Sequence, residues 1–109
     1  MISITECKLQ CNIDESEMDF DRWFAQTIPA TTAYLNNALN RKVYATKEAL
    51  AADEEAPEDA IVFNHDMKLA LLMLIGHWFV NRESSSALSL NETPMGLSML
   101  LSPYKSIYL

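Results

Sequence analysis

The stretch NHDMKLALLMLIGHWFVNRE, residues 64–83, decides the fold of this 109-residue chain. Its central part, residues 67–80, contains only three residues that are not hydrophobic, namely Lys68, Gly76 and His77. A helix that is apolar nearly all round is usually buried in a core or lies in a membrane. A membrane span needs about 20 apolar residues, and this run is shorter and interrupted. The stretch therefore predicts the central helix of a protein core.

Both ends of this stretch carry residues suited to helix ends. Asn64 is a good N-cap, Asp66 lies in the first turn, and Arg82 lies in the last turn near the negative end of the helix dipole. Gly76 costs roughly 1 kcal/mol relative to alanine in a helix interior. We therefore expect Gly76 to let another backbone approach closely.

The composition indicates a single compact domain over residues 1–109. Half of the residues are hydrophobic, and there are only two glycines and four prolines, which favours a helical chain over a disordered or β-rich one. The net charge of −7 argues against tight binding of nucleic acid, because phosphates require a basic patch. No secretory signal is predicted at the start, so we expect a cytoplasmic protein that does not bind membranes.

Two helices are predicted before the central one. The first, Ile4–Cys11, has apolar residues on one side and places Lys8 on the other. The second is a long amphipathic helix, Glu17–Asn40, in which apolar residues recur at three- and four-residue steps. Asp14 and Glu17 have the spacing of a capping box, so we expect them to start this helix.

The long amphipathic helix carries both a proline and an aromatic stripe. Pro29 lacks a backbone donor and is expected to kink or split the helix. The aromatic residues are expected to pack in the core against the central helix. We predict that Trp78 is largely buried there, near Trp23 or Phe24.

Residues 41–63 form the least regular segment. Residues 41–44 can be extended, and Thr46 can cap a short helix that ends at Ala52. An acidic loop then follows, with no lysine or arginine among its members: Asp53, Glu54, Glu55, Glu58 and Asp59. Such a cluster is either a solvated loop or a surface that faces DNA or a basic partner.

The last part of the chain contains a serine-rich connector, residues 84–90, and a short predicted helix, Pro94–Leu101, with Thr93 as its N-cap. Ser102 and Pro103 end this helix. The chain then finishes with three large apolar residues in succession: Ile107, Tyr108 and Leu109. Exposed apolar surface of this kind often marks a binding site for a partner.

The sequence contains no pattern typical of a catalytic site. The serines near Ser84 lack a glycine elbow, there is no glycine-rich phosphate loop, and His65 and His77 have no carboxylates at suggestive spacing. Cys7 and Cys11 could supply only half of a tetrahedral zinc site, so we expect buried, reduced thiols. We predict no enzyme activity, no cofactor and no metal, and an all-α domain with an oligomerisation or docking role.

Two motifs of the chain resemble those of the phage head–tail connector family, the portal adaptor or head-completion proteins. In that family a long apolar helix ends in histidine, two aromatic residues, any residue and Asn-Arg-Glu, and residues 72–83 read LMLIGHWFVNRE. Residues 8–20 are also similar to the family's opening. The residues of the second motif are Pro94, Gly96, Leu100, Leu101, Pro103, Tyr104 and Lys105.

The resemblance implies an all-α fold of two long antiparallel helices flanked by shorter helices, with the irregular acidic loop between the long ones. It implies a ring below the portal, expected to be twelvefold, that joins the DNA-filled head to the tail and extends the DNA channel. Its partners would be other copies, the portal and the next head-completion or tail protein, while DNA passes through without specific binding. The expected place is the virion head–tail junction, after assembly in the host cytoplasm. Pro29 departs from the uninterrupted second helix of the family.

Two interpretations remain open for the polar end of the central helix, which either ties this helix to the last one or contacts a ring neighbour. The candidate interface residues are Asn81, Arg82, Glu83, Tyr104, Ile107, Tyr108 and Leu109. The alternative function is that of a small regulatory or antitoxin-like helical protein that acts through protein–protein binding.

Overall fold

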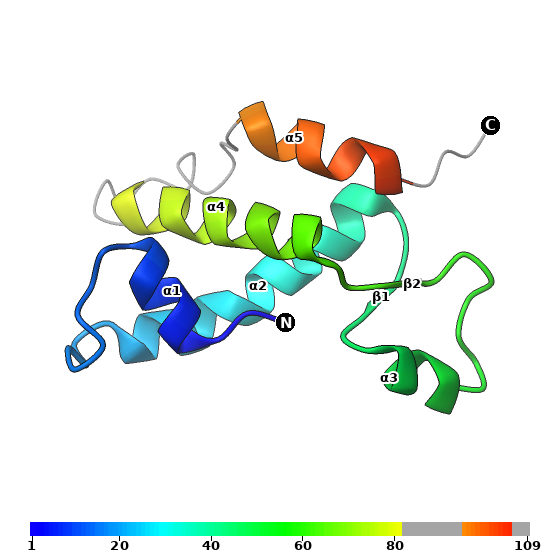
Figure 1. Ribbon diagram of the computed structural model, residues 1–109, viewed down its shortest axis with the longest axis horizontal. Coiled ribbons are helices and arrows are strands. Elements are labelled where there is room, and N and C mark those ends of the chain that lie inside the picture. The colour runs from blue at the N-terminus through cyan, green and yellow to red at the C-terminus, as the bar shows by residue number, and fades with distance from the viewer. Residues whose placement is uncertain (82–94, 106–109) are drawn as a thin grey trace.

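The computed structural model describes residues 1–81 and 95–105, and its central element is α4 (His65–Asn81). This helix lies against α1, α2 and α5 (Figure 1). The Asn64 side chain accepts a hydrogen bond from the Met67 amide at 3.0 Å, so the predicted N-cap is confirmed. Six α4 residues are buried on more than one side of the helix, as expected for a helix that is apolar nearly all round: Met67, Ala70, Leu71, Leu74, Ile75 and Trp78.

The second long helix, α2 (Asp21–Leu39), begins four residues later than predicted and continues unbroken through Pro29. The predicted split at Pro29 is wrong, and the alternative outcome, a kink there, stays a prediction. Both Pro29 and Ala25, whose carbonyl group loses its helical donor, are exposed, so water can replace the missing hydrogen bond. The helix ends at Asn40, which has the left-handed backbone conformation that asparagine tolerates.

The capping box predicted for Asp14 and Glu17 is also wrong. The Asp14 carboxylate instead accepts hydrogen bonds from the amide and hydroxyl of Ser16, at 2.9 and 2.8 Å. Because the carboxylate is already bound in this local turn, it does not cap α2. Short polar side chains often bind nearby backbone groups in this way instead of capping a helix. The residue at the start of α2 is Phe20, whose side chain makes no capping hydrogen bond.

The first helix, α1 (Ile4–Gln10), is fastened to both long helices by ion pairs. The Lys8 ammonium lies 2.8 Å from Asp21 Oδ1 at the start of α2, and the Lys68 ammonium of α4 lies 2.7 Å from Glu6 Oε2. Lys8 was predicted on the side of this helix opposite the apolar residues, yet its side chain is buried. Its charge is paired with Asp21, and the ammonium also donates to the Glu15 carbonyl at 3.1 Å.

Residues 41–63 are more regular than predicted. Strand β1 (Val43–Tyr44) lies in the segment expected to be extended, and α3 (Lys47–Ala52) is capped by Thr46 as predicted. A second strand, β2 (Ile61–Val62), pairs in parallel with β1, with Val43 opposite Ile61. The sequence analysis missed this strand because two residues are too few for an alternating pattern.

The last described elements are α5 (Met95–Leu101) and the 3₁₀ helix η3 (Ser102–Tyr104). α5 follows the predicted helix closely, while Thr93 and Pro94 lie outside the described residues. Leu97 and Leu101 are buried in the core. α5 and η3 run antiparallel to α4, because Gly96 lies next to Met73 whereas Tyr104 binds Asp66 in the first turn of α4.

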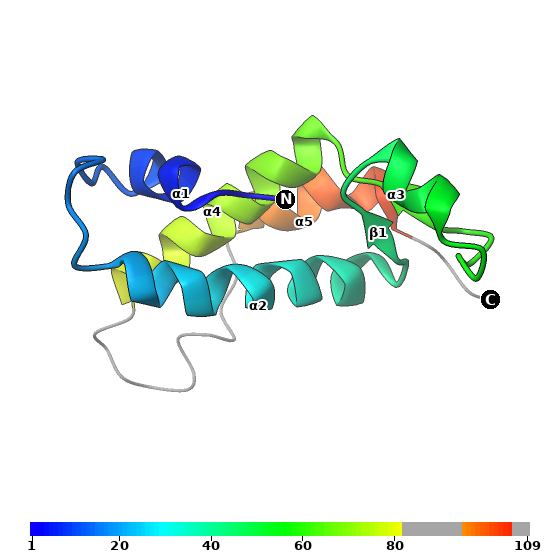
Figure 2. The same ribbon diagram turned by 90° about the horizontal axis from the view of Figure 1, so that it is seen from below.

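The fold is thus mainly helical, as predicted, with a small two-stranded sheet that the all-α prediction omitted. Figure 2 shows α2 along one side of the molecule, with α1, α4 and α5 covering it. In the described part of the chain, no helix combines the length and the hydrophobicity required to cross a membrane.

An aromatic cluster joins the last turns of α4 to the first turns of α2. The Phe79 ring stacks on Phe24 at 5.7 Å between centroids and meets Phe20 and Trp23 edge-on. Trp78 is buried, as predicted, with 7% of its surface exposed. The ring contacts with α2 are made by Phe79, the next residue along the helix.

Candidate assembly surfaces

A set of hydrogen bonds, which we call the C-terminal clamp, fixes η3 to the rest of the fold. Arg41 donates from Nε to the Asp59 carbonyl at 2.7 Å and from Nη1 to the Tyr104 carbonyl at 3.0 Å. The Tyr104 hydroxyl donates to Asp66 Oδ2 at 2.6 Å. The clamp therefore joins the end of α2, the turn before β2, the first turn of α4 and η3.

Tyr104 was a candidate interface residue, and the structure places its polar groups in intramolecular contacts. The hydrogen bond to Asp66 raises the pKa of the Tyr104 hydroxyl, because loss of the proton would set two negative charges side by side. Tyr104 thus joins η3 to the first turn of α4. Ile107, Tyr108 and Leu109 lie outside the described residues.

The segment predicted as an acidic loop, residues 53–59, connects α3 to β2, and we call it the acidic turn. Asp53 accepts a hydrogen bond from the Tyr44 hydroxyl, and the Lys42 ammonium lies 3.6 Å from the same carboxylate. The Tyr44 hydrogen bond is the main reason that the pKa of Asp53 is lowered. The expectation that these acids have no counter-ion is therefore wrong for Asp53, which holds the turn against β1.

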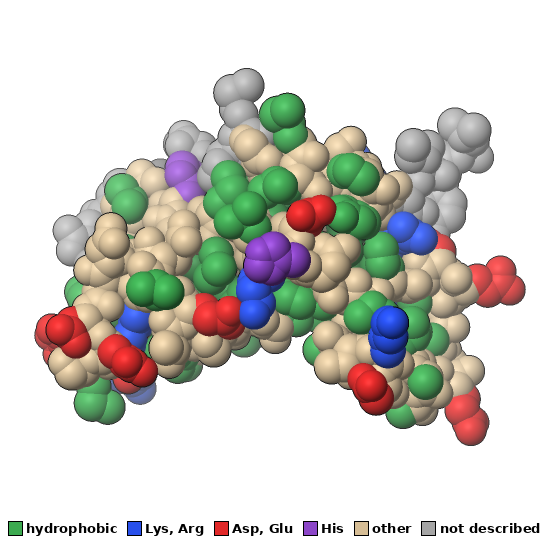
Figure 3. Space-filling model, viewed as in Figure 1, with side chains coloured by type: hydrophobic (Ala, Val, Ile, Leu, Met, Phe, Trp, Pro, Cys, Tyr) green, Lys and Arg blue, Asp and Glu red, His purple; other side chains and the backbone are tan. Residues whose placement is uncertain are grey.

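The other acids of the turn differ from Asp53. Glu54, Glu55 and Glu58 are exposed, and Asp59 is half-buried, with its carbonyl group held by Arg41. Figure 3 shows acidic side chains near both ends of one face of the molecule. One group lies over the acidic turn, and the other lies over residues 14–21 between α1 and α2. The second group contains five acids, so the acidic surface is larger than the predicted loop.

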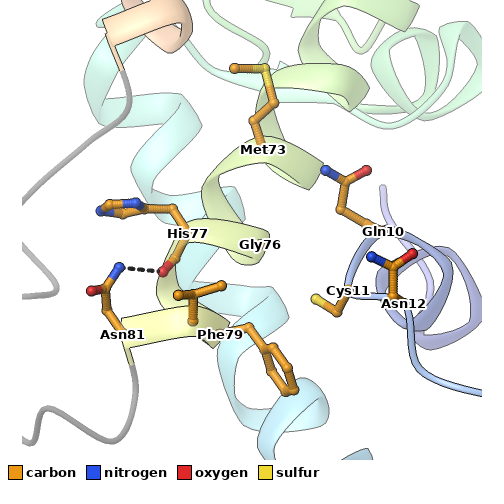
Figure 4. Close-up of a pocket in the computed structure, with 9 residues that line it drawn as sticks. Gln10, Cys11, Asn12, Met73, Gly76, His77, Phe79 and Asn81 are labelled. Carbon is orange, nitrogen blue, oxygen red and sulfur yellow. Dashed lines mark hydrogen bonds between the residues drawn. The ribbon is translucent and has the colours of Figure 1, made fainter.

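A groove of about 540 Å³ lies between the end of α1 and the last turns of α4. We call it the α1–α4 groove. Its α1 side is formed by Gln10, Cys11 and Asn12, and Figure 4 shows these residues facing α4 across the groove. On the α4 side the lining residues are Met73, Gly76, His77, Phe79, Val80 and Asn81.

Gly76 has a different neighbour from the one expected. A β-carbon at this position would lie 3.5 Å from Gln10 Cγ, an ordinary contact with a side chain. The prediction that Gly76 allows a close backbone approach is therefore wrong. The missing side chain instead leaves space along the floor of the α1–α4 groove.

Asn81, another candidate interface residue, lies at the edge of this groove. Its side-chain amide donates to the His77 carbonyl at 2.8 Å, a bond within α4 that caps the end of the helix (Figure 4). His77 Nε2 is buried and has no hydrogen-bond partner among the described residues. Arg82 and Glu83 lie outside the described residues.

Cys7 and Cys11 are not joined by a disulfide, so both are reduced, as predicted. Cys7 is fully buried, and desolvation raises the pKa of its thiol to about 12. Cys11 is half-buried and lines the α1–α4 groove. Among residues 1–81 and 95–105, no three histidine, cysteine or acidic side chains are grouped so that they could hold a metal ion.

Sequence reasoning missed the basic residues that organise these surfaces. Arg41 was treated as part of an irregular segment, yet it joins residues that lie 18 and 63 positions away in the chain. Lys8 was placed on the side of α1 opposite its apolar residues. No local pattern reports such distant partners, so only the tertiary fold could identify them.

These features define a small, mainly helical protein. Comparison with known proteins agrees with this class: the family model for phage gp6-like head–tail connector proteins matches residues 1–105. The chain therefore belongs to this family of phage structural proteins. No match was found among curated proteins or solved structures.

Proposed function

We propose that copies of this chain form a ring below the portal, joining the DNA-filled head to the tail and extending the DNA channel. The observation that carries this proposal is the family match over residues 1–105. It favours the connector over the regulatory or antitoxin-like alternative. The partners are then the portal on one side and the next head-completion or tail protein on the other, with twelve copies matching the portal.

In this ring the rigid body of each subunit is an antiparallel pair formed by α2 and α4. The support for rigidity is the aromatic cluster around Phe79, together with the ion pairs that fasten α1 to both helices. A subunit with such a core can keep its shape while its surfaces dock to different partners.

We also propose that the acidic turn faces the DNA channel or a basic partner. The exposed carboxylates of Glu54, Glu55 and Glu58 and the net charge of −7 support a wall that repels DNA instead of holding it. Replacing these three glutamates by glutamine should leave folding unchanged and impair DNA retention or ejection. Asp53→Asn serves as the contrasting variant, because this residue binds Tyr44 and Lys42 and its loss should lower stability.

The direct test is electron microscopy of the protein mixed with its own portal. The expected result is annular density on one face of the portal with the portal's rotational symmetry. Light scattering of the protein alone should show a monomer or a mixture whose mass rises with concentration. A tight twofold dimer at every concentration, with no density on the portal, would refute the proposal.

A further inference from the structure

We propose that the α1–α4 groove of one subunit receives residues 107–109 of a second copy of the chain. The inference rests on the proposed ring and specifies how neighbouring subunits join. The groove lies along the last turns of α4, whereas Tyr104, the residue of η3 nearest to this segment in the chain, lies at its first turn. Each subunit would then offer one groove to one neighbour and one apolar segment to the other.

The groove has the chemistry of a site for an uncharged, apolar segment. None of the described residues that line it is charged, although 21% of the chain consists of aspartate, glutamate, lysine and arginine. Val80 is 77% exposed, and the ring of Phe79 lies beside it. Covering such side chains removes apolar surface from water, which is the main favourable contribution to association. The sequence Ile107-Tyr108-Leu109 supplies apolar side chains to cover them.

Polar groups around the groove suit a main chain as well as side chains. The side chains of Gln10 and Asn12 line the α1 side, and both carry amide donors and acceptors. On the α4 side, Figure 4 shows the ring of His77 directed away from Gln10 and Cys11, so the two amide side chains are the polar groups that face the groove. A main chain brings a donor and an acceptor at every residue, so it can satisfy groups of both kinds.

The length of α4 shows why the segment must come from another copy. The C-terminal clamp holds Tyr104 at Asp66, in the first turn of α4, whereas the groove lies along its last turns. Phe79 is 13 residues beyond Asp66, which corresponds to about 20 Å along a helix. The four residues after Lys105 span at most about 14 Å even when fully extended. The groove begins at Met73, about 10 Å beyond Asp66, so these residues reach at most its near edge and cannot cover Phe79 and Val80 in their own groove.

A contact of this kind is head-to-tail, because two different surfaces of the same subunit are used. Head-to-tail contacts build rings when the rotation between neighbours closes, whereas a contact that uses the same patch twice stops at a dimer. In Figure 1 the end of α5 and the α1 side of α4 lie on opposite sides of the molecule, as such an arrangement requires.

The test uses the native thiol in the groove. In the variant Leu109→Cys, mild oxidation should link the new thiol to Cys11 of the next copy, because a disulfide forms only when the two α-carbons come within about 7 Å. Each chain then carries one thiol of each kind, so the expected product on non-reducing gels is a ladder of covalent oligomers. Cys7 is fully buried and does not compete.

The control variant combines Leu109→Cys with Cys11→Ser. It should lose the ladder and give at most a covalent dimer, formed through the introduced thiols of two chains. Three results would overturn the inference: a ladder that survives in the control, an internal disulfide in a product of monomer mass, or no linkage to Cys11 in peptide mapping.

A second pair of variants tests the groove without new thiols. Val80→Glu places a charge in the groove and should raise the concentration needed for half-assembly at least tenfold. Met99→Glu is the matched control, because Met99 is 78% exposed on α5, and it should leave assembly unchanged. If Val80→Glu instead lowers the melting temperature of the monomer and Met99→Glu does not, the groove is filled by the subunit's own chain and the inference fails.

The triple variant Ile107→Ser, Tyr108→Ser, Leu109→Ser separates this inference from the proposed function. Loss of annular density on the portal for this variant, with density retained for the wild type, supports both. Normal density for the variant overturns the inference and leaves the proposed function intact. Absence of density for the wild type overturns the proposed function itself.

Discussion

The two ends of α4 differ in their contacts: the first turn is hydrogen-bonded to other parts of the chain, and the last turns border a groove. At the first turn, Asn64 caps the helix, and Asp66 accepts the Tyr104 hydroxyl. At the last turns, the helix borders a groove whose described lining residues are uncharged. Val80 is largely exposed there, and His77 Nε2 has no partner among the described residues. The first turn is thus held by hydrogen bonds within the chain, and the last turn exposes the apolar side chain of Val80.

This difference indicates which end of α4 stabilises the subunit and which end is available for contact with another molecule. Polar groups that are already paired gain little from a new partner, since docking would first have to break their hydrogen bonds. Exposed apolar surface gains free energy when another molecule covers it. The clamped end of α4 is therefore suited to holding the subunit together, and the grooved end to contact with another molecule.

The variant with the largest expected effect, Trp78→Ala, tests whether the grooved end of α4 belongs to the hydrophobic core. Trp78→Ala removes a buried aromatic side chain from the last turns of α4. Truncation of such a residue usually lowers the free energy of unfolding by about 3–5 kcal/mol. Thermal denaturation should show a large fall in melting temperature. An unchanged midpoint would mean that this end is not part of the core.

The core was largely predictable from the sequence, and the Trp78 prediction shows the limit. Apolar residues on every face of the stretch 67–80 identified a buried helix without any tertiary information. The identity of the neighbour was off by one position, because Phe79 and not Trp78 makes the ring contacts with α2. Adjacent residues on a helix differ by about 100° in direction, and periodicity alone cannot fix the rotation of a helix that is apolar all round.

The second prediction concerns a variant that weakens the C-terminal clamp. Arg41→Ala removes two hydrogen bonds from a charged donor to the carbonyl groups of Asp59 and Tyr104. Such bonds contribute about 1–3 kcal/mol each to stability when their loss leaves groups unpaired. We expect a clear loss in chemical denaturation, with Arg22→Ala, at an exposed position of α2, changing stability by less than about 0.5 kcal/mol. Equal effects of the two variants would show that the clamp contributes nothing.

Two tyrosine–aspartate hydrogen bonds, one in the clamp and one at the acidic turn, should also make stability respond to alkaline pH. Hydrogen bonds to Asp66 and Asp53 raise the pKa values of Tyr104 and Tyr44 above the ordinary 10.0. A tyrosine whose pKa is raised on folding stabilises the fold fully below its unfolded pKa, and this stability is lost as the pH rises through the folded pKa. Melting temperatures should therefore fall above about pH 10.

The matched variant for this pH effect combines Tyr104→Phe with Tyr44→Phe. It should be less stable than the wild type near pH 8, because two hydrogen bonds are lost. Its melting temperature should then decline less steeply between pH 9 and about pH 11. A decline as steep as that of the wild type would assign the alkaline transition to other groups.

The surfaces were less predictable than the core. The sequence analysis found the acids of residues 53–59 but not their division into one tethered aspartate and three exposed glutamates. That division depends on Tyr44 and Lys42, which contact Asp53 from the other end of α3. The groove gave no sequence signal, since it is formed by a helix end and a turn more than 60 residues apart.

The variant with the smallest expected effect, Gly76→Ala, tests whether the groove has room for an added methyl group. Gly76→Ala should raise stability by up to about 1 kcal/mol, because alanine restricts the unfolded chain and favours the helix. The added β-carbon would lie 3.5 Å from Gln10 Cγ, so no neighbour has to move. Gly96→Ala is the matched control in α5: its β-carbon would lie 3.2 Å from Met73 Cε, so that side chain must shift, and the gain should be smaller. Melting temperatures of the two variants would decide the point. A loss of stability in Gly76→Ala with none in Gly96→Ala would mean that the floor of the groove is already filled, which would remove the contrast between the two ends of α4.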